Sequence, residues 1–279
     1  MPYMVNPRRN LPLKNQILMV LVRLRLRLPF EYLALQIGIS QSALNSTFWR
    51  IICLMYAKLK FFVKWPDRNN IRRTIPPVFK QSFLRLTSII DCFEIFIDRP
   101  ANLKARAQVY SNYKKHSTVK YLISCSPLGA VTFLSDAWGG RATAIQIVRG
   151  SGFISNKYHE PGDQILADRG FTLTDDFAAL CGAELLIPAF TKGRKKLTAK
   201  EVETTRKVAN IRIHVERVIG LIKNRYSILQ GPLPITLVKS LTNEVLGETA
   251  DIDKLVTVCA ALINLAPSIV YKENETSEI

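Results

Sequence analysis

An acidic residue interrupts an apolar, strand-like run near the start of the larger part of this chain. Residues 89–97 read Ile-Ile-Asp-Cys-Phe-Glu-Ile-Phe-Ile, which predicts a β-strand. A carboxylate inside such a strand is costly to bury unless it is paired or binds a metal ion. Asp91 is therefore a candidate functional residue, and a solvated or ion-paired carboxylate is the alternative.

The segments that follow this strand predict a mixed α/β body. Two apolar stretches, 119–124 and 130–134, flank a Ser-Pro-Leu-Gly turn and indicate a β-hairpin. The further elements that we expect are a helix at 143–148, a strand at 164–167, a helix at 174–181, a strand at 184–187, a long helix at 198–224 and an apolar helix at 255–265. Thr198 and Glu201 open the long helix as a capping box. This order is compatible with a ribonuclease-H-like core, an α/β fold built on a mixed sheet.

The N-terminal part predicts a small all-helical segment. Helical patterns cover residues 15–28, 30–37 and 41 to about 58, and a turn containing Gly separates the last two, as in a helix-turn-helix. Ser40 is the expected N-cap of the third helix. The first turns of that helix carry Gln41, Ser42 and Asn45, whose polar groups can reach base edges or phosphates. An ordinary helical hairpin packed on the body is the alternative.

These patterns divide the chain into four segments. We expect the helix-turn-helix at 12–60, a basic linker with one short helix near 77–84 at 61–84, the α/β body at 85–270, and a frayed polar tail at 271–279.

Charge is distributed unevenly along the chain. The net charge is +17, and residues 1–80 hold 14 Lys or Arg against 2 Asp or Glu, whereas residues 81–279 hold 25 against 20. A basic front end on a nearly balanced body suggests a polyanionic partner, such as nucleic acid. A basic protein without such a partner is the alternative.

Cysteine spacing and hydropathy exclude several classes of protein. The five cysteines are odd in number and form no Cys-x-x-Cys pair, which argues against a disulfide framework and a zinc site. The apolar run at 17–22 is too short to span a bilayer. We therefore expect no membrane association and a nuclear or cytosolic location.

Two further carboxylates lie where they could join Asp91. Asp168 closes the buried strand at 164–167, and Glu216 lies on the long helix, within about 40° of Arg212 and Lys223 at 100° per residue. Cleavage of a phosphodiester needs an activated water and stabilisation of charge on the phosphate, and two divalent ions can supply both. Mg²⁺ prefers hard oxygen ligands such as carboxylates. For each acid taken alone, a solvated or ion-paired carboxylate is the alternative.

The stretch from about 89 to 229 resembles the DDE superfamily endonucleases of the Harbinger type. The matching pieces, in chain order, are Asp91-Cys92-Phe93-Glu94-Ile95, Arg99-Pro100, Tyr110-Ser111-Asn112-Tyr113-Lys114, Ser126-Pro127-Leu128-Gly129-Ala130-Val131, Ser135-Asp136, Ser151-Gly152, Ala167-Asp168-Arg169-Gly170-Phe171 and Arg212-Ile213-His214-Val215-Glu216-Arg217. They cover about half of the chain. The preceding region resembles the helix-turn-helix that accompanies this domain in the same family.

The resemblance implies a function and a set of site residues. It implies a metal-dependent nuclease or transposase acting on DNA in the nucleus, with Asp91, Asp168 and Glu216 as the catalytic ligands of Mg²⁺ or Mn²⁺. Arg212, Glu216 and Lys223 also match a wider transposase pattern with three and six residues between them. It also leaves open a separate DNA-binding partner protein, and homo-oligomerisation is open as well.

Basic residues near the expected site suggest a path for DNA. Lys114 and Lys115 follow the first strand, and residues 192–196 hold four more basic side chains. Phosphate contacts by such residues supply most of the non-specific affinity for DNA. Together with Gln41, Ser42, Asn45, Arg212 and Lys223, these two lysines are the predicted nucleic-acid-binding residues. Solvated basic loops are the alternative.

Three departures from the family pattern keep a second interpretation open. Phe93 stands where the family usually has Thr, Ala144 where it commonly has Asp, and Ala209 where the wider pattern has Tyr. A domesticated DNA-binding protein whose nuclease site is inactive is therefore the alternative function. A helix-turn-helix regulator with an unrelated α/β body is a third.

Overall fold

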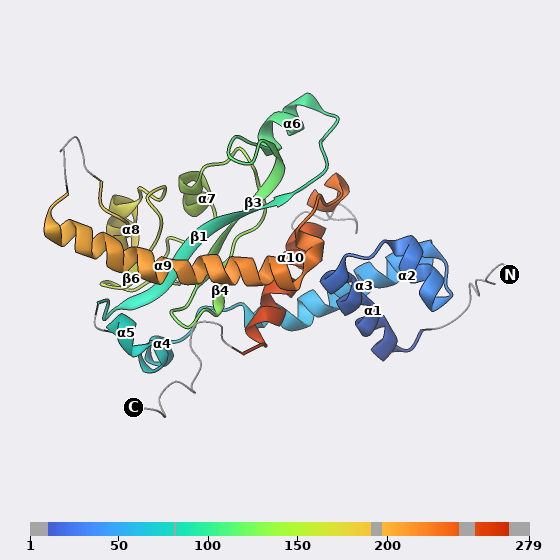
Figure 1. Cartoon of the computed structure of the whole chain (residues 1–279), viewed down its shortest axis with the longest axis horizontal. Coiled ribbons are helices and arrows are strands. Elements are labelled where there is room, and N and C mark those ends of the chain that lie inside the picture. The colour runs from blue at the N-terminus through green and yellow to red at the C-terminus, as the bar shows by residue number, and fades with distance from the viewer. Residues whose placement is uncertain (1–10, 81, 191–196, 240–248, 268–279) are drawn as a thin grey trace.

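The computed structural model describes residues 11–80, 82–190, 197–239 and 249–267, with a helical segment at one end and an α/β body at the other (Figure 1). The main helices are α1 (Leu13–Leu26), α2 (Phe30–Ile37), α3 (Gln41–Leu59), α4 (Arg68–Thr74), α5 (Pro77–Lys80), α6 (Leu103–Val109), α7 (Ala144–Gly150), α8 (Thr174–Cys181), α9 (Ala199–Arg225) and α10 (Asp251–Asn264). The strands are β1 (Leu86–Phe96), β2 (Tyr110–Ser111), β3 (His116–Cys125), β4 (Val131–Leu134), β5 (Trp138–Gly139), β6 (Gln164–Leu166) and β7 (Glu184–Leu186). Three short 3-10 helices are η1 (Lys60–Phe62), η2 (Ser227–Leu229) and η3 (Ile235–Val238).

The body is built on one mixed sheet with β1 at its centre. The strand order is β2-β3-β1-β6-β7, and β4 and β5 also pair with β3. β1 runs antiparallel to β3 and parallel to β6, which in turn runs parallel to β7. The predicted α/β fold with a ribonuclease-H-like sheet is confirmed, as is the expected hairpin of β3 and β4.

Helices cover the sheet on two sides. Successive side chains of a strand point to opposite faces, and β1 accordingly contributes to two separate cores. Ile89 and Phe93 pack in the core that includes Val215 of α9. Ile90 packs in the core that includes Ile147 of α7 and Phe177 of α8. Figure 1 shows α9 running across β1 (Figure 1). One face of β1 therefore meets α9, and the other meets α7 and α8.

The N-terminal helices have the predicted arrangement. The Ser40 side chain caps α3 by accepting a hydrogen bond from the Ala43 amide, and Gly38 ends α2 in a left-handed conformation with φ 75°. The predicted first helix, 15–28, has the right length but is displaced by two residues, because Arg27 adopts φ 54° and α1 spans Leu13–Leu26. The Arg23 guanidinium lies 3.5 Å from the centroid of the Phe30 ring, which joins α1 to α2 by a cation–π contact.

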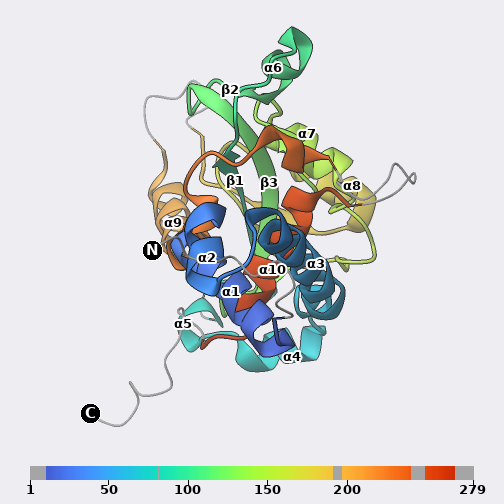
Figure 2. The same cartoon turned by 90° about the vertical axis from the view of Figure 1, so that its right-hand side faces the viewer.

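This helical segment shares its core with the body. Leu44 and Phe48 of α3 belong to the same buried cluster as Leu255 of α10, and Figure 2 shows α1 and α3 lying over α10 (Figure 2). In addition, the Arg25 guanidinium donates to the carbonyl oxygens of Asn224 and Arg225, at 3.3 and 2.9 Å, at the C-terminal end of α9. A cation at this end also favours the helix dipole.

The segment predicted as a linker is structured and attached to the body. It contains α4, which was not predicted, and α5, which is the expected short helix. Arg68 of α4 donates to the Asp163 carboxylate at 2.6 Å and to the Tyr158 carbonyl at 2.7 Å. α4 and α6 were missed because seven residues are too few to show a helical period. The predicted tail at 271–279 and the basic residues 192–196 lie outside the described residues.

The described residues bear on two sequence predictions, those on membrane spans and on cysteines. None of the described helices is both long and apolar enough to cross a membrane. All five cysteines lie in the described ranges and are free thiols, and Cys125, Cys181 and Cys259 are buried.

Candidate active site

Sheet pairing explains why Asp91 and Asp168 lie close together. In the parallel pair of β1 and β6, Ile89 is aligned with Leu166. Asp91 lies two residues beyond Ile89, and Asp168 lies two residues beyond Leu166. Parallel strands keep the same direction, so two steps from an aligned pair place both carboxylates at the same height and on the same face. The predicted convergence of these two acids is thus a consequence of strand register.

Asp91 lies in an unfavourable environment for a negative charge. Its side chain is partly buried in the centre of β1, and its Oδ1 accepts a 2.7 Å hydrogen bond from the Cys92 amide. The pKa of Asp91 is raised to about 6: burial is the largest cause and the negative charges of Glu216 and Asp168 add to it, whereas the Cys92 hydrogen bond and the positive charge of Arg212 act in the opposite direction. Perturbed pKa values of this kind are typical of functional sites.

α9 brings the third acid to the same place. Its apolar side chains at Ile211, Val215 and Val218 are buried, which fixes the rotation of the helix on the sheet. Glu216 and Arg212 are one turn apart beside this buried stripe, and their side chains pair at 3.0 Å. Arg212 also lies 3.6 Å from the Asp168 carboxylate. The guanidinium therefore links the acid of β6 to the acid of α9, next to Asp91.

The residues present match a divalent metal in chemistry. Three carboxylates supply the hard oxygen donors that Mg²⁺ and Mn²⁺ take, and Asp168 and Glu216 remain about half exposed, with side-chain accessibilities of 49% and 47%. In the described parts of the chain, no three Asp, Glu, His or Cys side chains are already arranged around one ion position. Instead, Arg212 supplies the positive charge between two of these acids.

The predicted DNA-binding residues of the helix-turn-helix are accessible. Gln41, Ser42 and Asn45 are exposed along the first turns of α3. The Gln41 side-chain amide donates to the Glu31 carboxylate of α2 at 3.0 Å, so it is held in place rather than freely mobile. Their role in recognition stays a prediction.

The predicted basic residues of the body fall into two groups. Lys114 and Lys115 are exposed at the turn between β2 and β3, where Lys115 adopts φ 58°. Lys223, by contrast, is partly buried, and its ammonium donates to the Glu94 carbonyl at 2.7 Å. Burial and the nearby Lys114 lower its pKa. Arg212 and Lys223 thus make contacts within the folded chain that could not be predicted from the sequence.

The three departures from the family pattern take ordinary structural places. Phe93 is buried and stacks on Tyr121 of β3, with ring centroids 5.5 Å apart. Ala144 is the first residue of α7, whose N-terminus Thr143 caps. Ala209 is exposed on α9. None of the three removes a carboxylate from the cluster of Asp91, Asp168 and Glu216.

Fold and site together define a ribonuclease-H-like domain with acidic residues gathered beside its central strand and a helix-turn-helix in front of it. Residues 90–264 match the family model described as DDE superfamily endonuclease. Residues 9–61 match the model described as helix-turn-helix of DDE superfamily endonuclease. The chain therefore belongs to the DDE superfamily endonucleases. No match was found among curated proteins.

Proposed function

We propose that this chain is a divalent-metal-dependent endonuclease of the transposase type that cleaves phosphodiester bonds in DNA. The observation that carries the proposal is that Arg212 pairs with both Asp168 and Glu216 and that all three of these residues influence the pKa of Asp91. The register of β1 and β6 and the buried stripe of α9 support a site formed by these three acids. Membership of the DDE superfamily endonucleases supports the same assignment.

Each acid has a distinct part in the proposed site. Asp91, Asp168 and Glu216 would hold Mg²⁺ or Mn²⁺, which when bound supplies an activated water and stabilises charge on the phosphate. Asp91 is the most buried of the three and fixes the inner end of the site against the sheet. Arg212 positions the carboxylates of Asp168 and Glu216 through its contacts at 3.6 and 3.0 Å. α3 would hold the DNA through Gln41, Ser42 and Asn45.

A domesticated, inactive DNA-binding protein is the second candidate. The observation in its favour is the bridge formed by Arg212, which already neutralises charge on two of the three acids. The changes at Phe93, Ala144 and Ala209 favour it as well. In this case the helix-turn-helix retains the function and the acidic cluster has none.

Nicking of a supercoiled plasmid separates the two candidates. We expect wild-type protein to nick the plasmid with Mg²⁺ or Mn²⁺, and Glu216→Ala to lower the rate by on the order of 10³-fold. Glu203→Ala is the matched control, because Glu203 is an exposed acid of the same helix, paired with Lys207 at 2.9 Å. Equal rates for wild type and Glu216→Ala, alone and with any candidate DNA-binding partner protein, would exclude the enzyme.

Location and organisation belong to the same proposal. We place the protein in the nucleus because DNA is its proposed substrate, and a fluorescent fusion found elsewhere would contradict this. We assign residues 12–60 to DNA recognition and 85–270 to the nuclease domain. Residues 61–84 join them as packed helices rather than as a tether. A homo-oligomer is the alternative to a monomer, and light scattering would distinguish the two states.

A further inference from the structure

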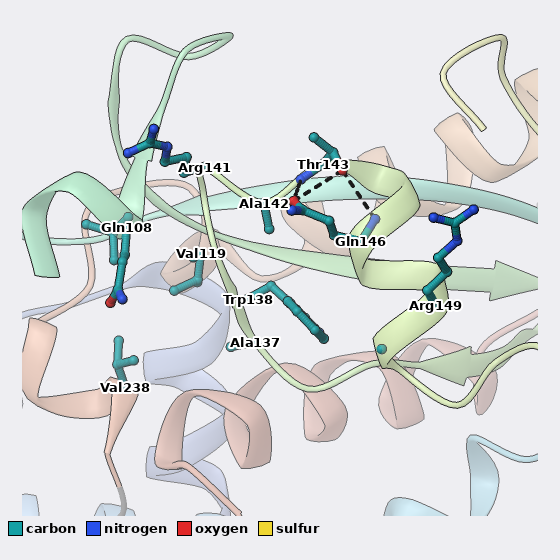
Figure 3. A pocket seen from close by; sticks show the side chains of 13 residues that line it. Gln108, Val119, Ala137, Trp138, Arg141, Ala142, Thr143, Gln146, Arg149 and Val238 are labelled. Carbon is teal, nitrogen blue, oxygen red and sulfur yellow. Dashed lines mark hydrogen bonds between the residues drawn. The ribbon is translucent and has the colours of Figure 1, made fainter. Parts of the chain in front are cut away.

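Two hollows lie on the body near α6, β5 and α7, and Figure 3 shows the larger one. The larger has a volume of about 1050 Å³, and Val109, Val119 and the indole of Trp138 line it. The smaller has a volume of about 360 Å³, and Arg106, Tyr110 and Asn112 are among its lining residues. Arg141 is a lining residue of both, so the two hollows adjoin at this residue. Together they are called the arm groove below. Asp91, Asp168 and Glu216 do not line it.

The walls of the arm groove are held in place by backbone contacts. The Arg141 amide donates to the Gln108 carbonyl at 3.1 Å, and this joins the end of α6 to the segment after β5. A side chain at Gly139 would meet that same carbonyl oxygen at 2.5 Å, so glycine is required for this close approach. A side chain at Gly150 would meet the Trp138 ring at 2.5 Å. The indole therefore lies directly against the backbone of α7, in a fixed orientation.

Two segments supply most of the lining of the groove, and their charged side chains are basic, with Asp98 and Asp136 directly before them in the chain. Residues 99–116 and 137–150 contain no Asp or Glu. Their basic side chains are Arg99, Lys104, Arg106, Lys114, Lys115, Arg141 and Arg149. Arg149 pairs with Asp176 at 2.8 Å, so Arg106 and Arg141 supply the basic excess among the residues that line the arm groove. Charge of this kind is complementary to a phosphate backbone.

Aromatic side chains alternate with these basic residues. Trp138 lines the larger hollow and is partly buried, because it packs against the core that includes Ile147. Tyr110, which is 41% exposed, lines the smaller hollow. Tyr113 is 81% exposed at the adjoining turn, and the Lys114 ammonium lies 4.7 Å from the centroid of its ring. Exposed rings cannot stack on bases that are paired inside a duplex, whereas unpaired bases stack on them readily.

We propose that the arm groove binds single-stranded DNA, with bases stacked on Trp138 and Tyr110 and phosphates held by Arg141 and Arg106. The proposal rests on the proposed function only in taking DNA as the substrate. It assigns to the chain a surface that is separate from the helix-turn-helix and from the acidic cluster. An unpaired strand next to a cleavage point would be such a ligand.

Fluorescence anisotropy with a labelled oligo(dT) of about 15 nucleotides and a blunt duplex of equal length tests the groove. The full chain is used in EDTA, where no cleavage occurs. We expect Tyr110→Ala to weaken binding of the oligonucleotide by about 5- to 100-fold and to leave duplex binding unchanged. Arg141→Gln should weaken oligonucleotide binding and lower its dependence on salt. Phe61→Ala and Arg72→Gln are matched controls on exposed residues of other elements.

Tryptophan fluorescence gives a second readout that does not depend on the rim variants. We expect oligo(dT) to quench the emission of the wild type, and Trp138→Phe to remove that quenching while the protein remains folded and still binds. Wild-type affinity in both Tyr110→Ala and Arg141→Gln, or unchanged quenching in Trp138→Phe, would overturn the proposal. Because binding is measured in EDTA, where the nuclease is silent, an inactive nuclease and a groove that does not bind are distinguishable results.

Discussion

Strand β1 carries two acidic side chains on opposite faces, and their surroundings differ. Glu94 is 8% exposed. One of its carboxylate oxygens accepts a hydrogen bond from the Thr118 hydroxyl at 2.8 Å, and the other pairs with the Lys120 ammonium at 3.3 Å. Its burial is thus matched by a hydrogen bond and an opposite charge, as is usual for a buried acid that serves the fold.

Asp91 faces the other side and has no such compensation. It accepts one backbone hydrogen bond, and its charged neighbours are two acids, Asp168 and Glu216, against one base, Arg212. Repulsion and burial together disfavour its ionised form, which is why its pKa is raised to about 6. The comparison shows that burial alone does not mark a functional acid. The mark is a buried acid placed among other acids, because such an arrangement lowers stability unless a cation is bound.

Removing the compensated acid should produce the largest change in stability. We expect Glu94→Gln to lower the free energy of unfolding by about 2–4 kcal/mol, because Lys120 would keep a buried charge without its partner. Urea unfolding measures this change. Nicking per folded molecule should stay at the wild-type level, since Glu94 lies on the face away from α9. A strong loss of activity in folded Glu94→Gln would break the distinction between the two acids.

Removing the uncompensated acid, Asp91, should raise the free energy of unfolding rather than lower it. The folded pKa of Asp91, about 6, lies above its ordinary value of 3.8. The folded state therefore holds its proton more tightly, and the resulting stabilisation is present below pH 3.8 and is lost as pH rises through about 6. We expect Asp91→Asn to raise the free energy of unfolding by about 1–3 kcal/mol at pH 7. The difference from wild type should shrink towards pH 4, and a difference that does not depend on pH would show that another interaction causes it.

A divalent metal should produce the smallest change in the free energy of unfolding, and its effect should again differ between variants of Glu94 and Asp91. With Mn²⁺ at ten times its dissociation constant, binding to the folded state alone stabilises by about 1.4 kcal/mol. We expect calorimetry in the absence of DNA to show this rise for wild type and for Glu94→Gln, but not for Asp91→Asn. A rise retained in Asp91→Asn would place the ion elsewhere.

The parts of the site that follow from strand geometry could be predicted. Asp91 and Asp168 lie inside or at the end of apolar runs, and parallel pairing then brings them together whatever the surrounding loops do. Glu216 was harder, because a helical wheel shows which residues share a face but not what that face meets. Its assignment came from the resemblance to the family, and α9 meets the sheet in agreement with it.

The helical positions of Arg212 and Lys223 did not reveal the contacts that these side chains make within the chain. Arg212, Glu216 and Lys223 share a face, which suggested two basic DNA contacts beside an acid. In the folded chain Arg212 pairs with Asp168 and Glu216, and Lys223 reaches a carbonyl of β1. These contacts depend on side-chain length and on the distance between α9 and the sheet, and neither quantity is present in a one-dimensional pattern. Their role in binding DNA stays a prediction.

The elements α6 and β2, which line the arm groove, could not be predicted from the sequence for a different reason. Only Val109 of α6 is buried, so this helix has no apolar stripe that a periodicity could show. β2 contains two residues and pairs with β3 through Ser111 and Tyr110 alone. Short elements of this kind form because a neighbouring framework already exists, and they become visible only once that framework is known.

The hydrogen bonds from Arg25 to the C-terminal end of α9 have a geometric consequence. This side chain of the recognition segment holds the carbonyl groups of Asn224 and Arg225, two to three turns along the helix from Glu216, and α3 packs on α10 in one shared core. The helix that would read the DNA and the helix that would help cut it therefore keep a constant separation. For a chain that acts as proposed, the cut should fall a fixed number of base pairs from the bound sequence, because the fold itself sets the distance between the recognised sequence and the cleavage point.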